Sequence, residues 1–121
     1  MTQIQKTKTY DLEDRTFYFA RKCRDFVKKI PKSIANIEYG KQLIRSSGSQ
    51  AANYIEANES ISKKDFSHRV KICRKEAKES RLWLRLCDTG GDNVLKTEQV
   101  KLIAEATELT KIFNSIAAKS E

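Results

Sequence analysis

The sequence contains few of the residues that interrupt helices. Its 121 residues include one proline and four glycines, which is little material for the tight turns of a sheet-rich fold. Long hydrophobic runs are also missing, because charged residues make up 33% of the chain. No stretch approaches the roughly 20 apolar residues that span a bilayer, and residues 1–10 lack the apolar core of a signal peptide. We therefore expect a helical, cytoplasmic protein that does not enter a membrane.

Histidine and cysteine are scarce, which leaves little chemistry for a catalytic or metal site. His68 is the single histidine, and Cys23, Cys73 and Cys87 form no C-x-x-C pair. Each cysteine falls on an apolar helical stripe, so we expect reduced, buried and inert thiols. A Ser-His-Asp arrangement would have to bring His68 to the distant serines of residues 46–49. We expect no enzyme activity, no metal and no cofactor.

Apolar side chains recur every three or four residues in four stretches, which predicts four amphipathic helices. The third is expected to end at Gly90 and Gly91 in a left-handed cap. Short connections make consecutive helices antiparallel, so residues 1–121 are expected to form one all-α domain, an up-down-up-down four-helix bundle. The helices are expected over residues 12–30, 34–59, 63–89 and 97–118.

Side chains that can accept from free backbone N–H groups mark where these helices begin. Asp11 is expected to cap the first helix, and Ser33 the second. Either Ser62 or Asp65 can open the third helix, and Thr97 is expected to open the fourth.

The middle of the second helix, residues 45–52, reads RSSGSQAA and is rich in small side chains. A glycine inside a helix costs about 1 kcal/mol relative to alanine, so a close contact must offset it. The spacing of a phosphate-binding G-x-x-x-x-G-K-[ST] loop is missing, which favours helix packing. Replacing Gly48 by leucine is therefore expected to overpack a contact. The expected close-packing residues are Gly40, Ser46, Ser47, Gly48, Ala51 and Ala52.

Two carboxylates of the third helix, Glu76 and Glu79, are one helical turn apart. They could act as a general acid and base, but an ion pair explains them better. If the second and third helices are antiparallel around a turn near residue 61, Arg45 lies level with Ala77. We therefore predict that Arg45 pairs with Glu76 or Glu79.

Some apolar residues lie outside the main stripes. The third helix carries Ile72, Trp83 and Leu86 on a second stripe, and the first helix leaves Phe17 and Tyr18 off its apolar face. On a monomer this area would be an exposed patch. We expect self-association to cover it.

The net charge of +8 is concentrated in two helices. Residues 12–32 carry +4 and residues 63–88 carry +5, whereas residues 33–60 carry −1. A basic surface attracts polyanions, among which nucleic acid is common, although the charge alone could serve only to keep the protein soluble. The residues expected to contact phosphates are Arg21, Lys22, Arg24, Lys28, Lys71, Arg74, Lys78, Arg81 and Arg85.

Two motifs carry a resemblance to a known family. The run R-S-S-x-S-x-x-A-N-x-x-E begins at Arg45, and the run K-E-A-x-E-x-x-x-W-L begins at Lys75. With the flanking segments they resemble the bacterial 23S rRNA-intervening sequence proteins over nearly the whole chain. Many relatives have glycine where this chain has Ala57. The motif residues expected to be structural or at an interface are Arg45, Ser46, Ser47, Gly48, Asn53, Glu56, Glu76, Glu79 and Trp83.

The resemblance implies a four-helix bundle that assembles as a homopentamer around a central channel. A similar branch, the accessory variability determinant proteins of diversity-generating retroelements, binds a reverse transcriptase and nucleic acid. Together with the charge, this predicts a non-enzymatic, homo-oligomeric nucleic-acid-binding protein, with RNA favoured. The alternative is a protein–protein adaptor or structural ring, for example a reverse-transcriptase accessory protein, without a direct nucleic-acid role.

Overall fold

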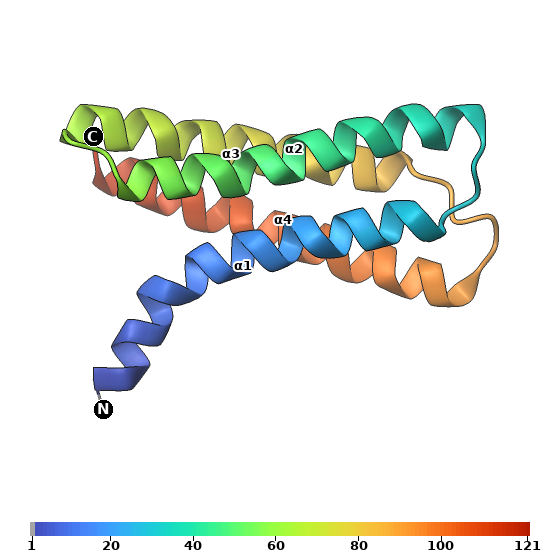
Figure 1. The fold of residues 1–121 in the computed structure, drawn as a ribbon, viewed down its shortest axis with the longest axis horizontal. Coiled ribbons are helices and arrows are strands. Elements are labelled where there is room, and N and C mark those ends of the chain that lie inside the picture. Colours follow the sequence, from blue (N-terminus) through green and yellow to red (C-terminus); the bar gives the residue numbers. More distant parts are fainter. Residues whose placement is uncertain (1) are drawn as a thin grey trace.

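Four helices account for almost the whole computed structural model, which describes the backbone of residues 2–121 and the side chains of residues 12–121. No strand occurs in these residues, so the predicted all-α four-helix bundle is confirmed. The helices are α1 (Thr2–Lys29), α2 (Ile34–Asn58), α3 (Lys63–Leu86) and α4 (Asn93–Lys119) (Figure 1).

Consecutive helices run in opposite directions (Figure 1). Helix α2 packs on α3, α3 packs on α4, and α1 packs on both α2 and α4. The described backbones of α1 and α3 make no contact with each other. The two helices with the highest positive charge therefore occupy diagonal corners of the bundle, separated by α2 and α4.

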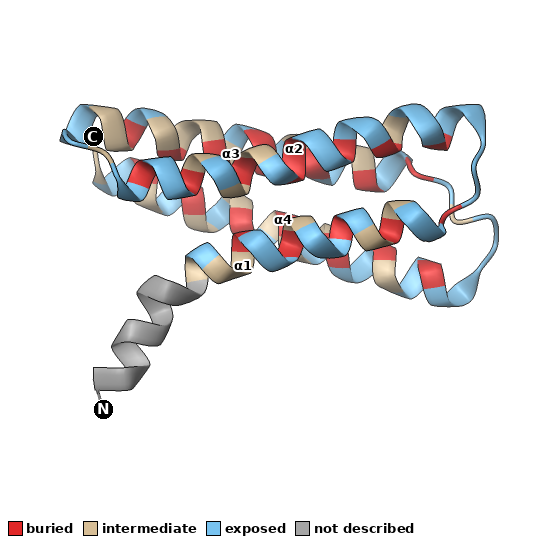
Figure 2. Cartoon of the chain, viewed as in Figure 1, coloured by how far each residue is buried: buried red, intermediate tan, exposed pale blue. Residues whose placement is uncertain are grey.

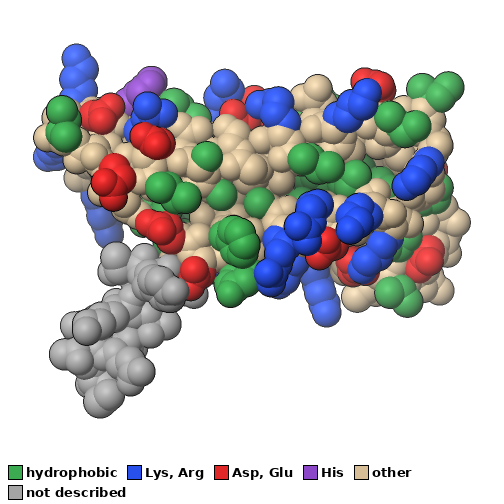
Figure 3. All heavy atoms as spheres, viewed as in Figure 1, with side chains coloured by type: hydrophobic (Ala, Val, Ile, Leu, Met, Phe, Trp, Pro, Cys, Tyr) green, Lys and Arg blue, Asp and Glu red, His purple; other side chains and the backbone are tan. Residues whose placement is uncertain are grey.

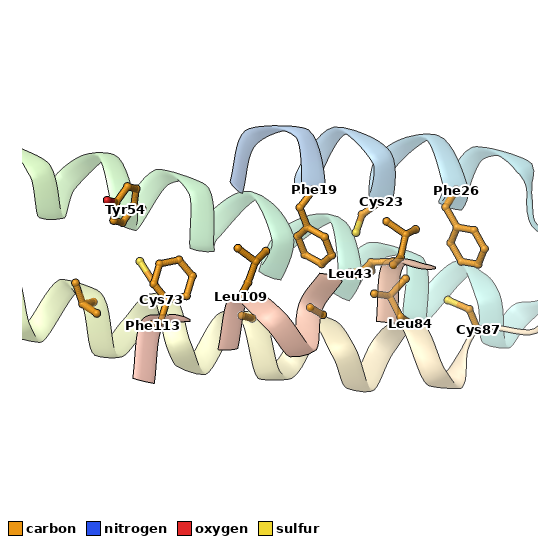
Figure 4. Close-up of a cluster of buried hydrophobic side chains, with 14 of the residues drawn as sticks. Phe19, Cys23, Phe26, Leu43, Tyr54, Cys73, Leu84, Cys87, Leu109 and Phe113 are labelled. Atoms are coloured by element: carbon orange, nitrogen blue, oxygen red, sulfur yellow. The ribbon is translucent and has the colours of Figure 1, made fainter. Parts of the chain in front are cut away.

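The apolar stripes predicted for α1, α3 and α4 form most of the core (Figure 2). In α2 the predicted stripe through Ile37 and Ile44 is wrong, because both isoleucines are exposed and Leu43 faces the core. Rings and aliphatic side chains from all four helices meet along the bundle axis (Figure 4), and the Tyr54 and Phe113 ring centroids are 5.9 Å apart. The buried apolar residues are Phe19, Cys23, Phe26, Ile30, Leu43, Tyr54, Ala57, Val70, Cys73, Ala77, Leu84, Cys87, Leu95, Leu102, Ala106, Leu109, Phe113 and Ala117.

Serine side chains cap the N-terminal ends of α2 and α3, as the sequence predicts. The Oγ atom of Ser33 accepts from the backbone N–H of Asn36 at 3.1 Å. At the start of α3, the Oγ atom of Ser62 accepts from the N–H of Asp65 at 3.0 Å. Of the two candidates for this cap, Ser62 is therefore the correct one.

The predicted starts of α1 and α4 are wrong. Helix α1 begins at Thr2 rather than near Asp11, because no proline or glycine interrupts the preceding residues; the Asp11 side chain lies outside the described residues. In α4 the cap is Asp92, which accepts from two backbone N–H groups of the first turn at 2.9 and 3.0 Å. Thr97 therefore lies inside the helix.

The end of α3 also differs from the prediction. The helix ends at Leu86, and the buried amide of Gln99 donates to two carbonyl oxygens near this end, at 2.8 and 2.9 Å. Gly90 and Gly91 do have positive φ values, +67° and +81°, but in the connection to α4. A Cβ atom at Gly90 would lie 2.7 Å from Cγ of Pro31, so a larger residue does not fit there.

One buried amide joins two connections at the same end of the bundle. The Nδ2 atom of Asn36 donates to the carbonyl oxygens of Pro31 and Asp88, each at 2.8 Å. Its Oδ1 atom accepts from the N–H of Asp88 at 2.9 Å. Asn36 is only 3% exposed, so these bonds are shielded from water and tie the α1–α2 connection to the α3–α4 connection.

The predicted close-packing role holds for Gly40 and is wrong for Gly48. A Cβ atom at Gly40 would lie 2.8 Å from Cγ1 of Val27 in α1. Gly48 and Ala52 are exposed, and a Cβ atom at Gly48 would meet nothing within 4 Å. The reason is helical periodicity: Ser46 and Ser47 already face the core, which turns Gly48 outward.

We predict opposite effects for two glycine substitutions. Gly40→Leu must displace the stiff Val27 side chain and should lower the free energy of unfolding by about 1–3 kcal/mol. Gly48→Ala should raise the free energy of unfolding of one chain by up to about 1 kcal/mol, because alanine is the better helix former and its Cβ meets no atom of the same chain within 4 Å. Denaturant unfolding of both variants measures the difference. Equal effects would contradict the assignment of the contact to Gly40.

Candidate nucleic-acid interface

The α2 motif meets the α3 motif in a network of ion pairs and hydrogen bonds. The Arg45 guanidinium lies 3.7 Å from Oε2 of Glu76 and 3.3 Å from Oε1 of Glu79, which confirms the predicted pairing. Ser49 donates to the same Glu76 oxygen at 3.2 Å. The Glu76 side chain is only 9% exposed, so these partners hold a carboxylate that little water reaches.

The network continues along the bundle to Asn53. Its Nδ2 atom donates to the backbone oxygen and Oγ of Ser49, at 2.9 and 3.2 Å, and its Oδ1 atom accepts from Arg69 at 3.0 Å. At the buried edge of this seam, the Oγ atoms of Ser46 and Ser80 are 2.8 Å apart. Most motif side chains therefore hold α2 against α3.

Two motif residues lie differently. Trp83 is half-buried and stacks on Tyr39 of α2, with ring centroids 6.0 Å apart, so much of it packs within the chain. Its indole N–H is buried and has no partner among the described residues. Glu56 lies exposed on α2. Of the second α3 stripe, Ile72 is half-buried and Leu86 is 43% exposed.

The basic residues predicted on α3 lie along its side next to α4. Arg74 donates to Oδ1 of Asn114, and Arg81 donates to Oγ1 of Thr107, each at 3.0 Å. Lys71 pairs with Glu121 at 2.9 Å, while Arg85 is exposed near the end of α3. A hollow of about 410 Å³ opens between the two helices. It is lined by Arg74, Lys78, Thr110, Lys111 and Asn114.

The basic residues predicted on α1 lie either in a groove next to α4 or exposed on the helix surface. Lys22 lines a groove of about 640 Å³ between α1 and α4, together with Lys101. Across this groove Lys29 pairs with Glu98 at 3.0 Å and Arg15 pairs with Glu105 at 2.7 Å. The others are exposed on α1: Arg21, Arg24 and Lys28. Figure 3 shows a cluster of Lys and Arg side chains over this helix.

Helix α4 therefore connects the two basic regions that the sequence assigned to α1 and α3. It contributes Lys101 to the groove on its α1 side and Lys111 to the hollow on its α3 side. The net charges of the separate helices gave no sign that α4 joins the two regions, because α4 itself is nearly neutral. We call this combined surface the basic face; its residues are Lys22, Lys29, Arg74, Lys78, Arg81, Lys101 and Lys111.

The thiols are buried, as predicted. Cys23 and Cys73 are 0% exposed and Cys87 is 4% exposed. Burial raises the pKa of Cys73 to about 12 and that of Cys87 to about 11, and it also raises the pKa of Cys23. All three are therefore protonated at neutral pH, which makes them poor nucleophiles.

The described residues contain neither a cluster of metal ligands nor a membrane-spanning helix. No group of three or more His, Cys, Asp or Glu side chains in residues 12–121 is placed to hold a metal ion. In the part of the chain that the structure describes, no helix combines the length and the apolar composition needed to cross a membrane.

We predict unequal costs for breaking the two ion pairs of Arg45. Arg45→Ala leaves the buried Glu76 carboxylate without its cation and should lower the free energy of unfolding by about 1–3 kcal/mol. Glu79→Ala removes a half-exposed partner and should cost less than about 1 kcal/mol. Urea unfolding measures both variants. If Glu79→Ala lowered the free energy of unfolding as much as Arg45→Ala or more, the ion pair between Arg45 and Glu76 would contribute no stability of its own.

Comparisons with known proteins agree with this architecture. The family model of the 23S rRNA-intervening sequence protein matches residues 8–115. A crystal structure from Bacteroides thetaiotaomicron VPI-5482, of a protein with unknown function from the S23 ribosomal protein family, is similar with a TM-score of 0.69 and 27% identity. The alignment covers 87% of this chain and 96% of that one. The comparison with curated proteins found no match. Because the family model spans most of the sequence, the chain belongs to the 23S rRNA-intervening sequence protein family.

Proposed function

We propose that this protein is a non-enzymatic homo-oligomer, a homopentamer, that binds RNA. The observation that carries the proposal is the division of its surface. Basic side chains from three helices gather on both sides of α4, whereas the outer side of α2 exposes a row of isoleucines and small residues. Phosphates would bind the first surface, and neighbouring copies would pack on the second.

The basic face offers cations that are available for phosphates. Lys22, Lys78 and Lys101 form no ion pair with any residue whose side chain is described. Arg74 and Arg81 are held by neutral partners on α4, Asn114 and Thr107, which orient the guanidinium groups without neutralising them. Fixed, uncompensated charges of one sign attract a polyanion, and they lose less side-chain entropy when it binds.

The opposite side of the bundle suits contact with another copy. Ile37, Ile44 and Ile55 are 45%, 46% and 49% exposed, although they are large and apolar. Gly48 and Ala52 are also exposed and lie between them in the helix. Small residues flanked by isoleucines let another helix approach closely. We call these five residues the α2 face.

The α2 face was not among the surfaces that the sequence predicted for self-association. The prediction selected Phe17 and Tyr18 of α1 and the second stripe of α3, where much of Trp83 packs within the chain. Ile37 and Ile44, which are seven residues apart, belong to the apolar stripe that periodicity predicts for the second helix. The signal against this stripe was Leu43, which belongs to the buried side of the helix together with Gly40, Ser47 and Tyr54.

We expect the molar mass of the purified protein in sedimentation equilibrium to be a multiple of its 13.9 kDa chain mass, five times that mass for a pentamer. Ile44→Asp places a charge in the α2 face and should reduce the mass, whereas Ile61→Asp should not. Ile61 is 99% exposed in the α2–α3 turn and is therefore a matched control outside this face. Sedimentation equilibrium at micromolar concentration tests this. A monomeric parent protein would refute the oligomer.

We expect RNA affinity to fall steeply with salt, with a log–log slope of about 0.7–0.9 per phosphate neutralised. Lys78→Glu in the basic face should weaken binding and reduce this slope. Lys41→Glu makes the same charge change on α2, where the lysine already pairs with Glu38 at 3.6 Å, and should have a smaller effect. Filter binding at several salt concentrations measures both. A parent protein that binds no RNA at low salt would leave the adaptor or structural ring as the function.

A further inference from the structure

Two aromatic side chains on α1 remain outside both the core and the α2 face. Phe17 is 53% exposed and Tyr18 is 44% exposed. Their ring centroids are 5.4 Å apart and the rings meet edge to face. The pair is therefore a small aromatic surface that lies outside the core.

A cation is held against both rings. The guanidinium carbon of Arg21, one turn further along α1, lies 5.5 Å from the Phe17 centroid and 4.9 Å from the Tyr18 centroid. Both distances are within the range of a cation–π contact. Arg21 forms no ion pair with the side chains of residues 12–121. Its charge is therefore positioned but not cancelled.

Three lysines lie near the pair, although Asp25, Glu98 and Glu105 line the groove between α1 and α4. Lys28 follows Arg21 at seven positions and therefore shares its side of α1. Tyr18 also lines the groove between α1 and α4, together with Lys22 and Lys101 of the basic face. The aromatic pair is therefore joined to the basic face rather than isolated from it.

We propose that Phe17, Tyr18 and Arg21 form a stacking site for an unpaired RNA base, with Lys22, Lys28 and Lys101 binding the adjoining phosphates. This rests on the proposed RNA-binding function and specifies single-stranded RNA as its ligand. Exposed aromatic side chains and guanidinium planes are the groups on which flipped-out or single-stranded bases stack. The bases of a duplex stack on each other, so their faces cannot reach the rings.

Charge argues against a contact in which this patch meets the same patch of a second copy. Such a contact would bring Arg21, Lys22 and Lys28 of one copy against the same residues of the other, and like charges in contact oppose it. In a pentameric ring each contact joins two different surfaces, so the sedimentation of the variant described below tests the patch for that role. An anionic ligand is the complementary occupant of the aromatic pair.

The test compares a single-stranded RNA 12-mer with an RNA duplex of the same length by fluorescence anisotropy at fixed salt. The variant is Phe17→Leu/Tyr18→Leu in the full chain, which keeps apolar side chains of similar size and removes the aromatic faces. Leucine is the better helix former, and both positions are half-exposed, so the fold should hold. Circular dichroism and sedimentation check the helix content and the oligomer.

We expect the double variant to bind the single strand about tenfold more weakly and to bind the duplex within twofold of the parent protein. The salt slope should stay the same, because no cation is lost. Tyr18→Phe retains the ring and should bind as the parent does. Arg21→Lys retains the charge but not the planar guanidinium, and should weaken only single-strand binding.

Other outcomes separate the stacking site from the proposed function. If the parent protein binds neither RNA at low salt, RNA binding itself is refuted. If it binds RNA and the double variant loses nothing, or loses the same factor for single strand and duplex, RNA binding stands and the stacking site is refuted. A fall in oligomer mass in the double variant would make the patch a contact between copies and would also overturn the stacking site.

Discussion

The burial of a single stripe on each helix is the constraint on which the rest of this structure depends. In a bundle of four, each helix packs on two neighbours and leaves its outer side to the solvent. Because α1 and α3 occupy diagonal corners, their charges lie at opposite edges of α4 and of α2. The composition of α2 and α4 then decides what each side of the molecule attracts. Lysines on α4 extend the positive surface, and isoleucines on α2 interrupt it.

Polar groups inside the bundle fix how the helices align. The core contains Thr16, Ser46, Gln50 and Ser80, none more than 2% exposed. The Gln50 amide donates to the backbone oxygen of Thr16 at 3.0 Å, and Ser46 bonds Ser80. A stripe of leucines could slide by a turn at small cost, whereas a displaced buried hydroxyl or amide would lose its partner. These bonds therefore favour one alignment of α1, α2 and α3 over its neighbours.

Periodicity was enough to predict much of the fold. The steps of three and four residues located all four helices. The antiparallel arrangement of α2 and α3 around their short turn was enough to place Arg45 near Glu76 and Glu79. Such features depend on one helix, or on two helices joined by a short turn. The polar caps of α2 and α3 were also predictable, because Ser33 and Ser62 act within their own first turns.

Features that depend on more distant neighbours were not predictable in the same way. Asn36 and Gln99 are ordinary polar residues in the sequence, and their roles follow from which carbonyl groups lie opposite them. Gly40 and Gly48 look alike in the sequence, yet only Gly40 faces Val27. The basic face follows from the diagonal placement of α1 and α3, which no single helix encodes. The sequence predicted Lys22, Arg74, Lys78 and Arg81 of this face but not Lys29, Lys101 and Lys111.

The hydrogen bonds of Asn36 hold one end of the bundle together in a way that the other end lacks. At one end they join both connections through buried groups, whereas the other end has a single turn, α2–α3, and the two chain termini (Figure 1). The packing between α1 and α4 is also the loosest of the four helix pairs. We therefore expect local opening to be easiest at the end away from Asn36, along the seam between α1 and α4. A wider groove between α1 and α4 at that end would leave the helices aligned at the Asn36 end.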